Sequence, residues 1–233
     1  MDVAIGCAQT ADGGVGPAPS DGPAVGVGSA AASSPCINNG EPQIKPLPFI
    51  HNIVATAQIH TSAPLHLDRL KQIFRFSSFN RRKFAAVTLR LVRPNCTILL
   101  FTSGKLVITG SKSSSEALLS AYRIRHLLRK ACTGQCFEII GFEIQNVVSH
   151  CELSIGEGEI LDIEALYERY HIYSTYQSHI FPGLIFRYPN LKVVALMFFS
   201  GKVVLTGAKS LKDIDDGWDV IFTLLKPYVV KRQ

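Results

Sequence analysis

The stretch FTSGKLVITGSKS at residues 101–113 recurs later in the chain as FFSGKVVLTGAKS at residues 198–210, with nine of thirteen positions identical. The same spacing of 97 residues relates KFAAVTLR, which ends at Arg90, to IFPGLIFR, which ends at Arg187. A third pair, HNIV and QNVV, lies 94 residues apart, so the copies differ by a few inserted residues. Two copies of this length predict a duplicated unit, because solenoids have shorter and more numerous repeats.

Each copy has the apolar pattern of an α+β unit. Two apolar runs flank Ser103 and Gly104, which predicts a tight hairpin turn between them. The first copy is predicted to contain, in order, a short strand around Asn52, a helix over 66–76, strands over 84–92, 96–102 and 105–110, and a helix over 114–130. The second copy repeats this order and ends in a helix around 213–225. Antiparallel strands with helices gathered on one side make an α+β fold.

The predicted sheet is apolar on both faces. In the strand over 96–102, Ile98 and Leu100 point one way while Leu99 and Phe101 point the other, and the second copy repeats this pattern. An antiparallel sheet with helices on one side normally has polar residues on its other side. Something other than water must therefore cover the second face: a second subunit, further helices or a ligand. The predicted helices are too few to cover both faces.

Charge is distributed unevenly along the chain. Residues 47–137 hold fourteen Lys or Arg against two acids, a net charge of +12, whereas residues 138–233 hold nine against twelve, a net charge of −3. Residues 1–46 also carry a net charge of −3. A half as basic as the first one favours a polyanionic partner, and a solvated basic face is the alternative.

Basic residues recur at matching positions beside the apolar strands of both copies. These residues are Arg90, Lys105, Lys112, Arg187, Lys202 and Lys209. An apolar sheet with a rim of cations fits a ligand that has an apolar floor between anionic walls. A duplex minor groove that is forced open has this form, because phosphates line both of its edges.

The composition of the first 46 residues differs from that of the rest. They are rich in Gly, Ala, Pro and Ser and nearly lack large apolar side chains, which predicts a disordered arm over residues 1–46. No apolar run approaches the roughly 20 residues of a membrane-spanning helix, and no secretory signal opens the chain. An intracellular protein with no membrane partner is therefore expected.

Catalytic and metal-binding patterns are weak in this sequence. Six cysteines are scattered without a repeated CxxC, so neither a metal site nor a cofactor is expected. His150, Cys151 and Glu152 follow one another in a predicted strand, where alternate side chains point to opposite faces and cannot converge. The sequence therefore does not favour an enzyme or a small-molecule substrate.

The elements QNVV, FPGL and SGKVVLTGAK, with their first-copy partners HNIV, KFAAV and SGKLVITGSK, resemble the TATA-box-binding protein (TBP) family. The resemblance covers about residues 47–230, with several motifs in the same order in both copies. It implies two pseudo-symmetric repeats, residues 47–137 and 138–233, that form a curved antiparallel ten-stranded saddle with helices on the convex face. The concave face of such a saddle would lie in the minor groove of A·T-rich promoter DNA and bend it.

The resemblance implies a DNA-binding role for three sets of residues. The family's intercalating wedges match Phe84, Phe101, Phe181 and Phe198. Its minor-groove contacts match Asn52, Val54, Leu99, Val107, Thr109, Asn146, Val148, Leu196, Val204 and Thr206. Its phosphate contacts match Arg82, Lys83, Arg90, Lys105, Arg187 and Lys202. A flat apolar ring can enter a pried-open base step, and small apolar floor residues clash with the guanine amino group.

Departures from the family pattern concern partner proteins. Gln177, Ser178 and His179 stand where the family has glutamates that engage transcription factor IIB, and the segment before Phe84 lacks the acidic position presented to factor IIA. His51 replaces a glutamine. The resemblance implies a nuclear general transcription initiation factor, with IIA- and IIB-type factors and other TBP-associated proteins as partners. The alternatives are a TBP-related paralogue acting at non-TATA promoters and a saddle used mainly as a protein-interaction module.

Overall fold

The computed structural model describes residues 45–232, and all of these residues belong to one compact unit. The predicted arm therefore lies outside the described residues except for Lys45 and Pro46. Lys45 forms an ion pair with Asp219, and the Pro46 carbonyl accepts a hydrogen bond of 2.7 Å from Nε1 of Trp218. These two residues, which the sequence pattern assigned to the arm, thus contact the folded unit.

Strands and helices follow the same order in both repeats. The strands are β1 (Phe49–Thr61), β2 (Ser77–Ser78), β3 (Ala86–Leu91), β4 (Cys96–Phe101), β5 (Lys105–Ser111), β6 (Phe137–Glu152), β7 (Glu159–Leu161), β8 (Ser174–Gln177), β9 (Phe181–Phe186), β10 (Val194–Met197), β11 (Lys202–Ala208) and β12 (Val229–Lys231). The helices are α1 (Leu67–Ile73), α2 (Ser114–Ala131), α3 (Ile163–Tyr170) and α4 (Leu211–Leu225), with short 3-10 turns η1 (His171–Tyr173) and η2 (Lys226–Tyr228). Within residues 45–232, no helix is long and apolar enough to cross a membrane.

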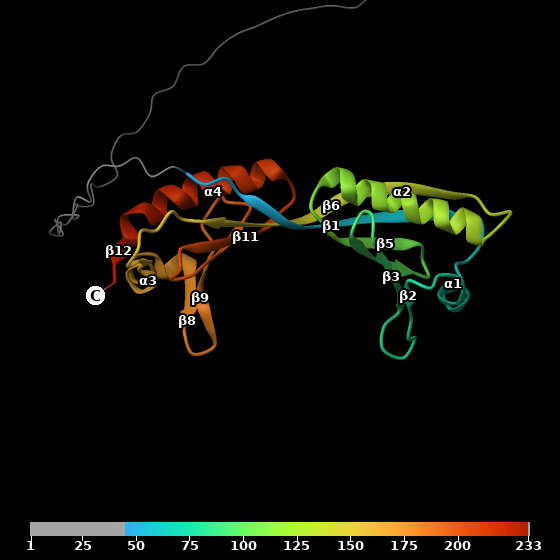
Figure 1. The fold of residues 1–233 in the computed structure, drawn as a ribbon, viewed down its shortest axis with the longest axis horizontal. Helices are drawn as coiled ribbons and strands as arrows, with labels where there is room; N and C mark the ends of the chain where they lie inside the picture. Colours follow the sequence, from blue (N-terminus) through green and yellow to red (C-terminus); the bar gives the residue numbers. More distant parts are fainter. Residues whose placement is uncertain (1–44, 233) are drawn as a thin grey trace, which may run out of the picture. The chain divides into compact units, whose positions relative to one another are not determined.

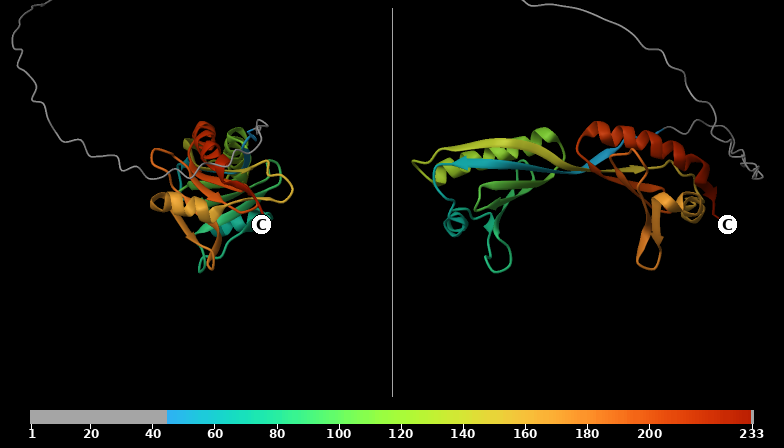
Figure 2. Two further views of the ribbon diagram at one scale, coloured as in Figure 1. Left: turned by 90° about the vertical axis from the view of Figure 1, so that its left-hand side faces the viewer. Right: turned by 180° about the vertical axis from the view of Figure 1, so that it is seen from behind.

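Ten strands form one antiparallel sheet in the order β2-β3-β4-β5-β1-β6-β11-β10-β9-β8, which confirms the predicted ten-stranded architecture. The long strands β1 and β6 pair at the centre, so each repeat supplies one half of a continuous sheet. β7 and β12 form a separate two-stranded sheet in the second repeat. Within the described unit, α2 and α4 both lie on one face of the sheet, and the β2–β3 and β8–β9 loops project to the other side (Figures 1 and 2).

The two faces of the sheet differ in burial, as the alternation in the sequence predicts. In β4, Ile98 and Leu100 are fully buried under the helices, whereas Leu99 and Phe101 on the other face are only half-buried. The second repeat has the same alternation in β11, where Leu205 is buried and Val204 is half-buried. We call the half-buried side the open face, because α2 and α4 cover only the opposite side.

Each repeat has its own apolar cluster beneath its long helix. The apolar stripe along α2 consists of Leu118, Ala121, Ile124, Leu128 and Ala131; Ala121, Ile124 and Leu128 are fully buried, while Leu118 and Ala131 are half-buried. Ala117 and Ser120 complete the buried side of the helix. Both long helices begin at a serine whose Oγ accepts a hydrogen bond of 3.1 Å from a backbone N–H three residues later, which satisfies one of the free donors of the first turn.

Local boundaries differ from the predicted ones where long-range pairing decides them. The helix predicted over 66–76 ends at Ile73, because Ser77 must leave the helix to pair with Leu89 of β3. The strand predicted over 84–92 begins at Ala86, since Phe84 closes a turn in which its N–H donates to the Asn80 carbonyl at 2.9 Å. The sequence pattern did not indicate the two-residue strand β2 or the β7–β12 sheet.

Candidate nucleic-acid interface

The four predicted wedge residues form two ring pairs, one in each repeat. The rings of Phe84 and Phe101 lie 6.0 Å apart at 64°, and those of Phe181 and Phe198 lie 5.8 Å apart at 69°. Edge-to-face contact of this kind is a favourable aromatic geometry. The structure therefore brings the predicted residues together in equivalent pairs, at the ends of the open face where strands β4 and β10 run into their hairpin turns.

Glycine residues hold these hairpin turns beside the wedges. The N–H of Gly104 donates to the Phe101 carbonyl and that of Gly201 donates to the Phe198 carbonyl, both at 2.9 Å. Both glycines have positive φ, +84° and +77°, a conformation that side chains disfavour. The motif Phe-x-Ser-Gly-Lys thus encodes a tight turn whose first residue is a wedge phenylalanine.

The two wedge pairs differ in the space around them. A Cβ on Gly183 would lie 2.7 Å from Cε1 of Phe181 and 2.9 Å from Cε1 of Phe198, so the glycine makes room for the second pair. Ala86 occupies the matching position in the first repeat, and Phe84 there is 46% exposed. Phe84 is consequently more exposed than its counterpart Phe181, which is half-buried.

A β-bulge stands on each side of the centre and orients a predicted asparagine. In the first repeat, Oδ1 of Asn52 accepts a hydrogen bond of 2.7 Å from the N–H of Gly110, and in the second, Oδ1 of Asn146 accepts one of 2.8 Å from Gly207. Both glycines have φ of +94°, as bulge glycines require. Because the amide oxygen is held by the backbone, the amide NH₂ is left to serve as a donor.

The centre of the open face, which we call the floor, alternates asparagine and valine side chains from β1 and β6. Asn52 faces Val148 across the β1–β6 pair, and Val54 faces Asn146. Further out, Leu99 pairs with Val107 and Leu196 with Val204, and all four of these side chains are half-buried on the open face. Thr109 and Thr206 lie in the bulges, with Oγ1 at 3.4 Å from the neighbouring asparagine oxygens.

The predicted phosphate contacts lie around this floor and are exposed. Lys105 and Lys202 begin strands β5 and β11. Arg90 lies in β3, and Arg187 directly follows β9. Arg82 and Lys83 lie in the turn before β3. Lys202 lies 3.9 Å from Glu152, an exposed pair that contributes little and leaves the ammonium accessible. The Asn80 side chain fixes the turn by accepting a hydrogen bond of 3.1 Å from the N–H of Arg82.

Residues missed by the sequence prediction complete the open face. Each of these residues pairs with a floor residue on the neighbouring strand. In the first repeat, Thr56 pairs with Val107 and Thr88 with Leu99. In the second, His150 pairs with Val204 and Ile185 with Leu196. The signal was available, because counting alternate residues from Asn52 and Asn146 reaches Thr56 and His150. The motifs HNIV and QNVV end before these residues, at Val54 and Val148.

The structure offers little for catalysis or metal binding. Within residues 45–232, no group of three or more His, Cys, Asp or Glu is arranged to hold a metal ion. Burial raises the pKa of the Cys151 thiol to about 12, and the pKa of Cys96 is also raised by burial, so neither is an activated nucleophile.

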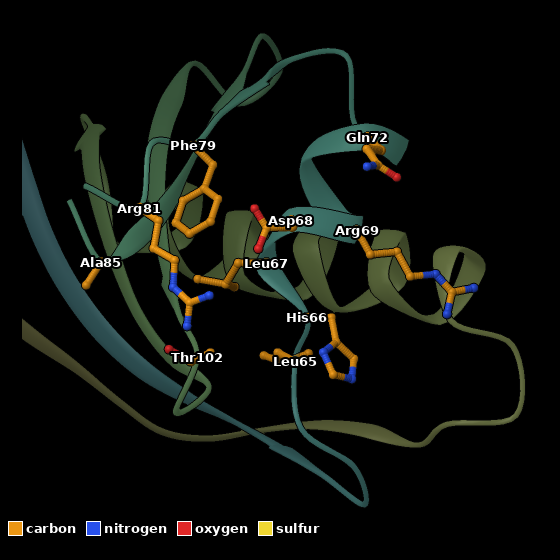
Figure 3. Close-up of a pocket in the computed structure, with 10 residues that line it drawn as sticks. All are labelled: Leu65, His66, Leu67, Asp68, Arg69, Gln72, Phe79, Arg81, Ala85 and Thr102. Carbon is orange, nitrogen blue, oxygen red and sulfur yellow. The ribbon is translucent and has the colours of Figure 1, made fainter. Parts of the chain in front are cut away.

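A cleft of about 840 Å³ lies beside the first wedge pair, between α1 and the turn that carries Arg81 (Figure 3). Its apolar wall includes Leu65, Leu67 and Phe79, and the Arg81 side chain extends across it toward Thr102. This cleft is not on the open face, since its walls are the helix and the outer side of the β4–β5 turn.

The sequence matches the family model described as "Transcription factor TFIID (or TATA-binding protein, TBP)" over residues 48–131 and again over residues 141–228. The chain belongs to this family. The two matched segments are the two repeats of the sheet, so the duplication found in the sequence is the duplication of the family fold.

Known relatives agree with this assignment. The TATA-box-binding proteins of Emericella nidulans, Drosophila melanogaster and Saccharomyces cerevisiae are 35%, 36% and 34% identical to the chain over 182 residues, 78% of its length. Those alignments cover 65%, 49% and 72% of the relatives, so the chain matches about half to two thirds of the length of the first two. The solved structure of Methanococcus jannaschii TBP superposes with a TM-score of 0.65 at 30% identity, over 78% of this chain and 99% of that one.

Proposed function

We propose that the chain binds A·T-rich double-stranded DNA through its open face, bends it, and thereby seeds the assembly of a transcription initiation complex. The observation that carries this proposal is the pair of aromatic wedges at equivalent ends of an apolar floor. Two rings at each end can enter a base step, and the floor between them can pack against a widened minor groove. Exposed cations around the floor supply the phosphate contacts that most of the affinity requires.

The bases would be distinguished by the floor. Half-buried Leu, Val and Thr side chains leave no room for the guanine amino group, which is the feature that separates G·C from A·T pairs in this groove. The oriented amides of Asn52 and Asn146 supply donors for the acceptors of A·T pairs near the centre.

Energy transfer across a duplex labelled at both ends tests the proposal, because bending shortens the distance between the dyes. Wild-type protein should raise the transfer on an A·T-rich duplex, and Phe101→Ala or Phe198→Ala should reduce it and weaken binding about tenfold or more, since base stacking contributes about 1–3 kcal/mol per ring. Leu119→Ala, on the helix face of α2, is the matched control and should change neither. Unchanged transfer on wild-type binding would contradict bending, and a large loss of melting temperature in the phenylalanine variants would assign those rings to the core.

A second candidate is a related factor that acts at promoters without a TATA element. The exposed loop Gln177, Ser178, His179 and Ile180 favours it, because acidic side chains expected there by family resemblance are missing. Gel shifts with a TATA duplex and a scrambled duplex at several salt concentrations separate the two candidates, since only the first requires a clear preference for TATA.

Partner proteins would meet the helix face. Arg123, Arg129 and Lys130 of α2 are exposed there, whereas Arg125 is half-buried over the Tyr122 ring, 4.9 Å from its centroid. The basic surface fits an acidic protein segment, and factors of the IIA and IIB type are candidates. A protein that binds promoter DNA to start transcription would act in the nucleus.

A further inference from the structure

The open face carries two equivalent groups of four side chains, one on each side of the centre. The polar group, beside Val107 of the first repeat, consists of Thr56, Glu143, Gln145 and Lys209. The aromatic group, beside Val204 of the second repeat, consists of Phe49, His51, Lys112 and His150. The repeat spacings relate them one to one: Thr56 to His150, Glu143 to Phe49, Gln145 to His51, and Lys209 to Lys112.

The strand register shows that this correspondence is spatial. Thr56 faces Glu143 across the β1–β6 pair, and His150 faces Phe49 across the same pair. On their other sides, Thr56 pairs with Val107 and His150 pairs with Val204, the equivalent floor residues. Thr56 and His150 are both half-buried on the open face. They therefore occupy the same position in the floor of the two repeats.

Hydrogen bonds link the members of the polar group. Nε2 of Gln145 donates to Oγ1 of Thr56 at 2.8 Å and to Oε2 of Glu143 at 3.0 Å. Nζ of Lys209 lies 3.3 Å from Oε1 of Glu143. The Thr56 hydroxyl, which accepts this bond, keeps its own O–H hydrogen but lies close to the backbone, and the lysine neutralises the carboxylate. The polar group therefore reaches less far toward a bound base than an imidazole at the same position.

The aromatic group holds a ring with a free polar edge. The His150 ring lies 5.1 Å from the Phe49 ring and 6.0 Å from the His51 ring, and Nζ of Lys112 lies 5.8 Å from the Phe49 centroid. Within residues 45–232, no protein group forms a hydrogen bond with the His150 ring nitrogens. An imidazole in either protonation state has an N–H to donate, and it reaches further from the backbone than a threonine hydroxyl.

We propose that His150 is a specificity-determining residue of the second repeat, which donates a hydrogen bond to the adenine N3 acceptor of an A·T pair in the minor groove. Phe49 and His51 hold the ring on the floor. A guanine amino group would block this bond, so the half-site under the second repeat tolerates G·C pairs less than the half-site under Thr56. The inference rests on the proposed function, and it predicts that the two half-sites are read differently.

Atomic substitution in the DNA tests this contact directly. In a set of A·T-rich duplexes, one adenine at a time is replaced by 3-deazaadenine, which lacks the N3 acceptor, and dissociation constants are measured by fluorescence anisotropy. Wild-type protein should lose affinity about three- to tenfold at one or two positions in one half-site, the effect of a single hydrogen bond. His150→Phe keeps a ring beside Phe49 but lacks the N–H, and it should show no loss at those positions.

The controls separate the contact from the fold and from the proposed function. Thr56→Val, at the matched position, should keep the loss at the positions that His150 reads, and His150→Thr, which copies the first repeat, should lose that sensitivity as His150→Phe does. Melting without DNA identifies any variant that fails to fold. Identical profiles for wild type and both folded His150 variants overturn the inference alone. A wild-type protein that does not bend the unmodified duplex overturns the proposed function as well.

Discussion

The outer ends of the two repeats differ more than their wedge pairs do. In the first repeat, the space between α1 and the β4–β5 turn is the open cleft that contains Thr102 (Figure 3). In the second repeat, Phe199 occupies the position of Thr102, and its ring lies 6.4 Å from that of Tyr176, which in turn lies 6.2 Å from the Tyr167 ring. The wedge pairs beside them have nearly the same geometry.

This contrast shows which features the duplication has kept. The turn glycines and the bulge glycines are the same in both repeats, because each has a positive φ that few other residues can adopt. Packing around the periphery has diverged, since many combinations of apolar side chains can fill a core at the same density. Four predictions follow from particular differences between the repeats, in order of decreasing expected effect.

The largest effect on stability should come from Trp218, which is fully buried in α4. The equivalent residue of α2 is Ala121. Trp218→Ala should lower the free energy of unfolding by about 3–5 kcal/mol, because the second repeat was built around the indole and cannot collapse onto an alanine. Urea denaturation measures the change. A loss below about 1 kcal/mol would show that the second core repacks as the first one does.

Two further variants resolve the contribution of the indole N–H. Trp218→Phe keeps most of the volume but removes the donor to the Pro46 carbonyl, and should cost about 1–2 kcal/mol. Deleting residues 1–44 should leave this bond intact, whereas deleting residues 1–46 should destabilise the chain by a similar amount. A wholly disordered arm over 1–46 could be deleted without loss of stability, and the Pro46 contact is the reason to expect a loss instead.

The second effect concerns the turns that precede Phe84 and Phe181. The first of these turns contains Arg81, Arg82 and Lys83, whereas the matching residues 178–180 of the second include no Lys or Arg. Changing Arg81, Arg82 and Lys83 together to glutamine should reduce the slope of log affinity against log salt by about 2, because Arg82 and Lys83 are the predicted phosphate contacts and each lost contact removes about 0.9. DNA binding at several salt concentrations measures the slope.

The matched control for that triple variant lies on the helix face. Arg123, Arg129 and Lys130 carry the same charge on α2, and changing all three to glutamine should leave the slope nearly unchanged. A reduced slope for this control would mean that α2 faces DNA, and the orientation proposed for the open face would be wrong.

The third effect comes from exchanging the residues at one equivalent position, Thr102 in the cleft of the first repeat and Phe199 beside Tyr176 in the second. Thr102→Phe should stabilise the first repeat by about 0.5–1 kcal/mol, because the ring can fill the cleft beside Phe79 as Phe199 does beside Tyr176. Phe199→Thr should destabilise the second repeat by about 1 kcal/mol. Thermal unfolding measures both, and DNA affinity should stay the same in each. A destabilised Thr102→Phe variant would show that Arg81 closes the space.

The smallest effect should come from Glu143, whose position is held by Phe49 in the other repeat. Hydrogen bonds from Lys209 and Gln145 lower the pKa of this carboxyl from its ordinary value of 4.5. A lowered pKa gives stabilisation that is complete above the ordinary value and is lost as the pH falls through the lowered one. Glu143→Gln should therefore be slightly less stable than wild type at pH 7, and the two should converge in acid. Parallel urea midpoints down to low pH would exclude this linkage.

Sequence alone determined the features that depend on neighbouring residues. The repeat of FTSGKLVITGSKS as FFSGKVVLTGAKS required a duplicated fold, and period-two alternation assigned Leu99 and Val107 to a face opposite the core. The glycine of the Ser-Gly-Lys motif predicted the hairpin turns, because such a turn needs a residue that tolerates positive φ. Such features are local, because a strand's alternation and a turn's φ angles are set within a few residues of the chain.

Tertiary structure decided everything that joins distant segments. Phe84 meets Phe101, Asn52 binds Gly110, and Trp218 donates to Pro46 only because the order and register of the strands place them together. The pairing of Thr56 with Glu143 and of His150 with Phe49 likewise appears once β1 and β6 pair at the centre. Strand register over tens of residues depends on the packing of the whole sheet against its helices, and composition and local spacing carry no measure of that packing.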